Sequence, residues 1–246
     1  EAVGSAVTRF RPGDAVFAEV QSGGCAEYVA VAERFVAAMP ANISFEQAAA
    51  VPMAATTALQ GLRDRGHLEA GQRVLINGSS GGVGTFAVQI AKTYGAHVTA
   101  VTSTRNVELV RSIGADRVVD YTKDDVTSHE DRYDLILDTA ASHSLAAFRR
   151  LLTRNGTFVP VGAGGGRWLG PAGYMLRAAL LSPFVAQTLA PVREQRNAAD
   201  LQVLAELIRD GRVTPVIDRT FPLSAVADAI RYLEQGHARG KVVIAE

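Results

Sequence analysis

A glycine-rich segment at residues 73–84, with the sequence RVLINGSSGGVG, constrains the fold of this chain most. Residues 74–77 are typical of a short buried strand, and a glycine-rich turn follows them. Residues 85–94 then carry apolar side chains at helical spacing, and Gly95 is a stop signal for that helix. A strand, a glycine turn and a helix in this order predict a phosphate-binding cradle. Free backbone N–H groups and the helix dipole both favour an anion there.

The match of this segment to the dinucleotide pattern G-x-G-x-x-G is imperfect, because Ser79 occupies the first glycine position. Gly81 lets the backbone approach a pyrophosphate, and Gly84 lets the helix pack closely against the strand. The context strengthens the prediction, since a second strand is expected at 97–102, where a βαβ unit needs one. The alternative is a glycine-rich turn that binds nothing.

The end of the strand at 97–102 indicates which dinucleotide is bound. Folds that bind NAD carry Asp or Glu about 20 residues after the glycines, where it binds the ribose 2′-hydroxyl. Here the strand is followed by Ser103, Thr104 and Arg105, with no carboxylate. A carboxylate would repel a 2′-phosphate, whereas Arg can bind it through two hydrogen bonds. NADPH is therefore favoured over NADH. The alternative is that Ser103 and Thr104 cap the next helix and Arg105 faces solvent.

Strands and helices alternate beyond the glycine turn, and this predicts an α/β fold with a parallel sheet covered by helices on both faces. Residues 1–40 are typical of β structure, and Ser44 begins a capping box that opens a helix. Asn197 and Ser224 are expected to cap two later helices. The other expected helices are 107–113 and 144–152, and the other expected strands are 117–120, 133–138, 157–161 and 241–245.

Charge and cysteine content exclude several classes of protein. The 25 basic residues balance the 25 acidic ones, so no basic surface indicates a nucleic-acid partner. The single cysteine, Cys25, excludes an internal disulfide framework and a cysteine-rich zinc site, and it is expected to be a small buried side chain. The first residues do not have the pattern of a secretory signal, and a cytoplasmic location is expected. The apolar stretch 169–192 is interrupted by proline and arginine. It is therefore expected to cover a surface or contact a subunit rather than span a membrane.

Six motifs are spread from one end of the chain to the other: EAVG at 1–4, FRPGDAV at 10–16, GCAEY at 24–28, the turn at 77–84, VDY at 119–121 and GKVVI at 240–244. In these motifs the chain resembles the medium-chain dehydrogenase/reductase superfamily, in its zinc-independent quinone oxidoreductase (zeta-crystallin-like) branch. Members of this branch begin with a further stretch of catalytic-domain sequence, so the resemblance implies an N-terminally shortened chain. It also implies a partial GroES-like catalytic domain at 1–51, an NADP-binding Rossmann domain at 52–190, and a segment at 191–246 that returns to the catalytic domain.

The resemblance implies a set of residues that bind the cofactor. Tyr121 resembles a tyrosine that helps hold the 2′-phosphate, and Thr57 resembles a threonine near the nicotinamide. Lys241 stands where zinc-containing relatives place a cation on the cofactor phosphates. The alternatives are a strand-end aromatic for Tyr121, a hydroxyl bonded to its own helix for Thr57, and a solvated strand terminus for Lys241. In chain order, the implied residues are Thr57, Ser80, Gly81, Gly82, Val83, Ser103, Arg105, Tyr121 and Lys241.

Zinc is expected to be absent, because Met53 stands about where relatives place a ligand cysteine and the four-cysteine lobe is missing. Without zinc, the oxidation of an alcohol would lack the Lewis acid that polarises the reacting oxygen. Hydride transfer from NADPH to a quinone or an α,β-unsaturated carbonyl needs less help beyond positioning. The sequence therefore predicts an NADPH-dependent reductase of such acceptors, with no identifiable general acid. The alternatives are a zinc-free alcohol dehydrogenase-like protein and a non-catalytic NADPH-binding sensor or structural protein. A homodimer is expected, because unpaired strand edges seek partners.

Overall fold

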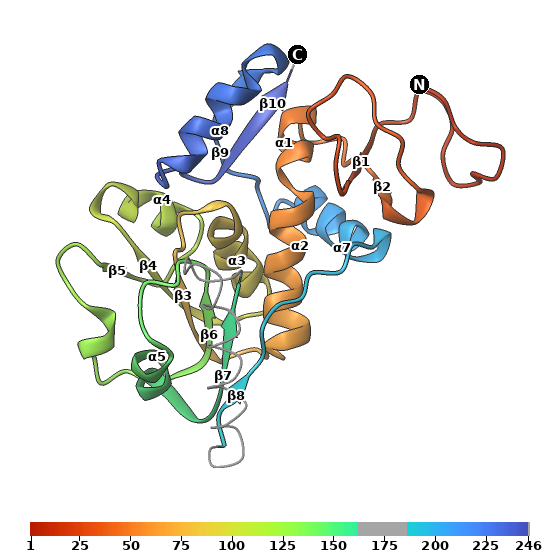
Figure 1. The fold of residues 1–246 in the computed structure, drawn as a ribbon. Helices are drawn as coiled ribbons and strands as arrows, with labels where there is room; N and C mark the ends of the chain where they lie inside the picture. The colour runs from red at the N-terminus through yellow and green to blue at the C-terminus, as the bar shows by residue number, and fades with distance from the viewer. Residues whose placement is uncertain (162–185, 246) are drawn as a thin grey trace. The chain divides into compact units, whose positions relative to one another are not determined.

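The computed structural model describes residues 1–161 and 186–245, and the chain divides into two compact units (Figure 1). Unit 1 comprises Glu1–Thr56 and Glu194–Glu246, and unit 2 comprises Thr57–Arg193. The expectation for the apolar stretch 169–192 falls largely outside the described residues.

Unit 2 is built on a six-stranded parallel sheet with the order β5-β4-β3-β6-β7-β8. The chain runs from β3 outward through β4 to β5 and then returns to the other side of β3 with β6. The position between β3 and β6 is therefore a topological switch point, where doubly wound folds bind their ligands. The strands are β3 (Arg73–Asn77), β4 (His97–Thr102), β5 (Arg117–Asp120), β6 (Tyr133–Asp138), β7 (Leu152–Pro160) and β8 (Thr188–Leu189).

Helices cover both faces of this sheet. On β6, Ile136 belongs to a buried cluster that includes Phe148 of α5 (Leu145–Leu151). Its neighbour Leu135 points the other way, where a Cβ added at Gly66 would lie 2.6 Å from Leu135 Cδ2. Alternate side chains of one strand are thus buried against opposite layers, which explains why the strands read as continuous apolar runs. The other helical segments of unit 2 are α3 (Gly82–Thr93), α4 (Val107–Ser112), and the short 3₁₀ turns η3 (Thr104–Asn106) and η4 (Val126–Ser128).

Unit 1 carries less regular structure. Strands β1 (Val16–Ala18) and β2 (Val36–Ala38) pair antiparallel, and β9 (Ile217–Pro222) and β10 (Lys241–Ala245) pair parallel. The prediction of β structure throughout 1–40 is therefore wrong for most of that range. The helices and turns of unit 1 are η1 (Glu33–Phe35), α1 (Phe45–Ala50), α7 (Ala198–Arg209), η6 (Leu223–Ala225) and α8 (Val226–Glu234).

Two of the three predicted helix caps are confirmed. Ser44 Oγ accepts from Gln47 N at 3.2 Å, and Gln47 Oε1 accepts from Ser44 N at 3.0 Å, which completes a capping box. Asn197 Oδ1 accepts from Asp200 N at 2.7 Å at the start of α7. The cap predicted at Ser224 is wrong, because a 3₁₀ turn contains that residue and α8 begins at Val226.

Helix α2 (Pro52–Gln60) begins at the predicted proline, continues as one π-helical turn, η2 (Gly61–Arg65), and ends at Gly66. The division between the two units falls within α2. Within the described ranges, no helix has both the length and the apolar character needed to cross a bilayer. The expected fold class, a doubly wound α/β domain with a partial β-rich domain, is confirmed by the parallel sheet and its connections.

Candidate functional site

The glycine turn after β3 is made by Gly78 rather than by the residue at the first pattern position. Gly78 has φ +81°, and a Cβ there would lie 2.4 Å from Thr139 Oγ1. Ser79 is fully buried, and both its backbone N–H and its Oγ donate to Val101 O, at 3.1 and 2.9 Å. Ser79 therefore ties the turn to β4, and the tight turn needs glycine one residue earlier. This explains why the pattern is imperfect while the turn is intact.

Packing requires glycine at position 84 but not at position 81. A Cβ on Gly84 would lie 2.2 Å from Gly78 O, so the packing of α3 against the turn requires glycine there. A Cβ on Gly81 would meet only Gly78 O, at 3.5 Å, which is an ordinary contact. The backbone of Gly81, with φ −79° and ψ 177°, suits any residue. Neither packing nor conformation explains glycine at position 81, and the space beside it is open to a ligand.

Helix α3 starts at Gly82, three residues earlier than predicted, and its first turn faces the open side of the glycine turn. The N–H groups of a first helical turn have no partner within their helix, and Gly81 at the N-cap has no side chain to accept from them. The first turn, which includes Val83, carries no acidic residue, so the positive end of the helix dipole is not neutralised there. These features fit the pyrophosphate of a dinucleotide.

Ser80 adds a side-chain donor to this turn. Its Oγ accepts from Thr102 Oγ1 at 2.9 Å and from Asn106 Nδ2 at 3.0 Å. A hydroxyl oxygen has two acceptor positions, so its own O–H remains available to donate. Hydrogen bonds from Thr102 of β4 and Asn106 of η3 therefore fix the Ser80 hydroxyl, and its own proton remains to be donated. A phosphate oxygen would be a suitable acceptor for that proton.

Ser103, Arg105 and Tyr121 lie at the neighbouring ends of β4 and β5, since Tyr121 N donates to Thr102 O at 3.0 Å. Arg105 is exposed, and the Tyr121 side chain is 59% exposed. The alternative that Ser103 and Thr104 cap the following helix is wrong. Ser103 stands at the N-cap of η3 without a side-chain capping bond, and Thr104 Oγ1 instead donates to Asp120 Oδ2 at 2.6 Å.

Asp120, at the end of β5, is a carboxylate beside this group that the sequence analysis did not consider. The hydrogen bond from Thr104 Oγ1 is the largest cause that lowers the pKa of Asp120, to about 2, and bonds from Thr122 and Lys123 act in the same direction. Asp120 is therefore ionised at neutral pH, with its oxygens engaged by these neighbours. The motif VDY at 119–121 contained the signal, but its tyrosine alone was interpreted.

A second polar group that the sequence analysis missed lies at the switch point. Asn77 ends β3 and Asp138 ends β6, and both are buried, with exposed fractions of 2% and 6%. Asn77 Nδ2 donates to Asp138 Oδ1 at 2.8 Å and to Ser142 Oγ at 3.0 Å. Thr139 Oγ1 donates to Gly78 O at 3.2 Å. The loop after β6 is thus attached to the glycine turn at the carboxyl edge of the sheet. A polar residue closing each of two apolar strands was the available signal.

The two remaining predicted residues lie elsewhere on the chain. Thr57 is a buried residue of α2 and the first residue of unit 2. Lys241 begins β10 in unit 1, where burial lowers the pKa of its ammonium group. It lines a hollow of about 670 Å³ in that unit, together with Glu19 and Met53. The roles of Thr57 and Lys241 toward a cofactor stay predictions.

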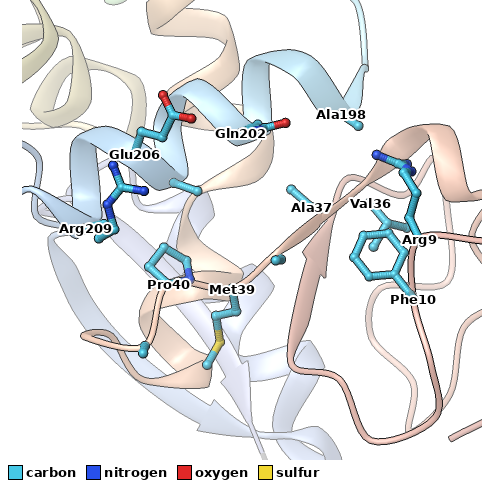
Figure 2. A pocket seen from close by; sticks show the side chains of 13 residues that line it. Arg9, Phe10, Val36, Ala37, Met39, Pro40, Ala198, Gln202, Glu206 and Arg209 are labelled. Carbon is cyan, nitrogen blue, oxygen red and sulfur yellow. The ribbon is translucent and has the colours of Figure 1, made fainter.

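Unit 1 also contains a groove of about 470 Å³ between β2 and α7. Figure 2 shows the side chains of Glu206 and Arg209 at one end of this groove and those of Arg9 and Phe10 at the other. None of the predicted site residues lines the groove. Within 1–161 and 186–245, no three His, Cys, Asp or Glu side chains gather as metal ligands would. Cys25 is exposed, so the prediction that it is buried is wrong; the segment around it forms no strand that could cover it.

Known proteins are similar to this chain in both sequence and fold. A family model described as zinc-binding dehydrogenase matches residues 113–244. The NADPH-dependent alkenal/one oxidoreductase of Arabidopsis thaliana chloroplasts is 38% identical over 255 residues, which cover 98% of this chain and 60% of the relative. The chloroplast envelope quinone oxidoreductase homologue of the same plant is 33% identical, covering 98% of this chain and 75% of the relative. The chain therefore spans between three fifths and three quarters of these proteins.

Solved structures agree with this relationship. The quinone oxidoreductase from Coxiella burnetii superposes with a TM-score of 0.85 at 28% identity, over 98% of this chain and 75% of that one. An alcohol dehydrogenase superfamily protein from Novosphingobium aromaticivorans gives 0.84 at 31% identity, over 100% and 78%. With the six-stranded sheet and the glycine turn at its carboxyl edge, these matches establish the family. The chain belongs to the medium-chain dehydrogenase/reductase superfamily, among the quinone oxidoreductase-like proteins.

Proposed function

We propose that this protein is an NADPH-dependent oxidoreductase that transfers hydride to a quinone or an α,β-unsaturated carbonyl without zinc. The observation that carries the proposal is the glycine turn. Gly81 has no packing or conformational reason to be glycine, and it stands before an uncapped helix N-terminus. Ser80 has an O–H left to donate at the same place. The names of two relatives, an alkenal/one oxidoreductase and a quinone oxidoreductase homologue, support the acceptor class.

In the proposed binding mode the cofactor extends over both halves of the sheet of unit 2. The pyrophosphate fits the turn at Ser80–Val83, and the adenosine side fits the ends of β4 and β5, near Arg105 and Tyr121. The nicotinamide side then extends across the switch point toward β6. When bound, the cofactor supplies the hydride, and the protein contributes position and exclusion of competing reactions.

The preference for NADPH over NADH rests on the residues beside the ribose. The end of β4 has no carboxylate, and Arg105 is an exposed guanidinium there, suited to two hydrogen bonds with a phosphate. Asp120 is ionised nearby, but Thr104, Thr122 and Lys123 already donate to it. We expect Arg105 to outweigh Asp120 at the 2′-phosphate.

Independence from zinc rests on the ligand chemistry of the chain. Zinc in dehydrogenases is held by Cys and His side chains. This sequence has one cysteine, and Met53 stands about where the resemblance places a ligand cysteine. A quinone or an enone accepts hydride at an already electron-poor carbon, so the reaction does not depend on a metal Lewis acid. Metal analysis of the purified protein tests this point, and one zinc per chain would favour the alcohol dehydrogenase interpretation.

The decisive experiment compares wild type with Gly81→Ala in two measurements. NADPH binding is followed by its fluorescence, and NADPH oxidation is followed with a panel of quinones and enones. We expect wild type to bind and oxidise NADPH, and Gly81→Ala to bind at least tenfold more weakly with an unchanged melting temperature. Equal NADPH affinity in the two proteins would remove the cofactor assignment. Binding without oxidation of any acceptor would favour a non-catalytic NADPH-binding protein.

We further propose a homodimer located in the cytoplasm. Among the described residues, β1–β2 and β9–β10 form separate two-stranded sheets, whose outer edges have no strand partner. Such edges pair readily with another chain. Light scattering of the purified protein tests the dimer, and imaging of a tagged protein tests its location.

A further inference from the structure

A chain of hydrogen-bonded side chains leads from the switch point to the protein surface. Ser142 Oγ accepts from Asn77 Nδ2 at 3.0 Å and lies 2.9 Å from His143 Nδ1. His143 Nε2 lies 3.3 Å from Asp125 Oδ1, and the Asp125 side chain is 58% exposed. A carboxylate, an imidazole and a hydroxyl are thus joined in series. All four residues belong to unit 2.

The position of Ser142 relative to the cofactor follows from the arrangement of the sheet. In the proposed binding mode the adenosine side lies over β4 and β5, near Arg105 and Tyr121, so the nicotinamide side would lie over β6 and its following loop. Ser142 is an exposed residue of that loop. Asn77 is the last residue of β3, directly before the glycine turn, and its hydrogen bond holds Ser142 there. The hydroxyl therefore stands at the carboxyl edge of the sheet beside the switch point, on the side proposed for the nicotinamide.

The hydrogen bonds around Ser142 fix the direction of its proton. When His143 is an imidazolium, Nδ1–H donates to Ser142 Oγ and Nε2–H faces Asp125. Ser142 Oγ then accepts two hydrogen bonds, one from His143 and one from Asn77, and its own O–H remains available to donate. The ring of His143 is also held edge-on against Phe148, with ring centroids 5.4 Å apart.

We propose that Ser142 is the proton donor of the reductase and that His143 and Asp125 resupply its proton from solvent. This rests on the proposed function. When bound, NADPH would supply hydride to the acceptor, whose oxygen would then need a proton. Ser142 Oγ–H gives its proton to that oxygen, and His143 Nδ1–H replaces it on Ser142. The imidazole then recovers a proton from solvent at the Asp125 end. The acceptor gains H⁻ and H⁺, NADPH becomes NADP⁺, and no other reactant is needed.

The charged environment of His143 supports this role. Hydrogen bonds from Thr127 are the main causes that lower the pKa of Asp125, and the charge of His143 contributes further. Asp125 therefore stays ionised at neutral pH and presents a negative charge to His143 Nε2. Apart from Asp125, the groups described around the ring are Ser142 and Phe148, and neither is charged.

The kinetic test uses Ser142→Ala, Ser142→Thr and His143→Gln in the full chain, with an enone as acceptor. A positioned general acid contributes about 10²–10⁴-fold. We expect Ser142→Ala to lower kcat at least thirtyfold, Ser142→Thr to keep most of it, and NADPH affinity to stay within twofold in both. The dependence of wild-type kcat on pH is measured as well, and His143→Gln should flatten it. Undiminished kcat in Ser142→Ala would overturn the proposal.

A control and a second readout separate this inference from the proposed function. Ser144→Ala removes the N-cap of α5 two residues away, so it should lower the melting temperature and leave kcat unchanged. The His143 ring resonance, identified by its loss in His143→Gln, should shift when NADP⁺ is added. If this resonance does not shift although the protein binds NADP⁺, His143 lies away from the bound cofactor and the relay is refuted. Wild type that binds NADPH but reduces no acceptor would instead refute the proposed function, and the relay with it. An active wild type with normal variants would refute the relay alone.

Discussion

A buried carboxyl group in unit 1, Glu19, has the carboxyl group of Glu194 as a neighbour and makes the stability of this protein depend on pH. Glu19 is only 6% exposed, and its Oε2 is buried without a hydrogen-bond partner among the described residues, as is Oε1 of Glu194. Burial is the largest cause that raises the pKa of Glu19, from 4.5 to about 7. The charge of the neighbouring Glu194 raises it further, while the positive charge of Arg196 lowers it.

The direction of the effect follows from proton binding. Between pH 4.5 and 7 the folded state holds the Glu19 proton more tightly than the unfolded chain does, so the free energy of unfolding falls as pH rises through this window. At about 1.4 kcal/mol for each pKa unit, the full loss by pH 8 is about 3 kcal/mol, an upper bound because the two carboxyl groups titrate together.

Glu19→Gln removes the ionisation and keeps the shape and polarity of the side chain. We expect the variant to unfold at nearly the same urea concentration as wild type at pH 4.5. At pH 8 its free energy of unfolding should be higher than that of wild type by up to about 3 kcal/mol. Urea titrations of both proteins at several pH values measure this difference. Glu27→Gln, at an exposed glutamate of the same unit, controls for the loss of one negative charge. A difference between Glu19→Gln and wild type that is constant from pH 4.5 to 8 would refute the reasoning.

Three further substitutions test the turn, the cofactor preference and a cap. Gly84→Ala places a Cβ 2.2 Å from Gly78 O and should lower the free energy of unfolding by about 1–3 kcal/mol in urea titrations, and an unchanged value would contradict the packing argument. Arg105→Ala should weaken NADPH binding about tenfold and leave NADH binding unchanged, since a hydrogen bond to a charged group contributes about 1.5–3 kcal/mol; equal losses for both cofactors would refute the 2′-phosphate assignment. Ser44→Ala should lower the melting temperature through a loss of about 1 kcal/mol at the cap of α1, whereas exposed Ser5→Ala should not.

Strands β4, β5 and β6 could be predicted closely from the sequence because each is a short apolar run between turn signals. β7 instead begins at Leu152, five residues before its predicted start at 157. The limits expected for β4, β5 and β6 match those observed. Strand β8 was not predicted, because it is only two residues long and is defined by its pairing with β7. The same reason explains the failure over residues 1–40. Valines there suit strands, but a strand also needs a partner, and the described chain supplies partners only at β1 and β2.

Helix caps show the same division between local and distant causes. The bonds of Ser44 and Asn197 close within three residues, and both caps were predicted correctly. Ser224 has the right residue type but lies within a 3₁₀ turn, so α8 starts later. Residue type predicts a cap only where the backbone of that residue is itself extended, as it is at Ser44 and Asn197.

The candidate site combines a locally encoded part with a part assembled from distant segments. The turn from Gly78 to Gly84 is specified by neighbouring residues. The pattern located it even though Ser79 replaces a glycine, because the positive φ that requires glycine is at Gly78. The polar groups around the turn come from elsewhere, as Asn77 reaches Asp138 across 61 residues and Thr104 reaches Asp120 across 16. A motif can therefore predict that a dinucleotide is bound. Which dinucleotide is bound, and how its product is protonated, depends on charges that only the folded sheet brings together.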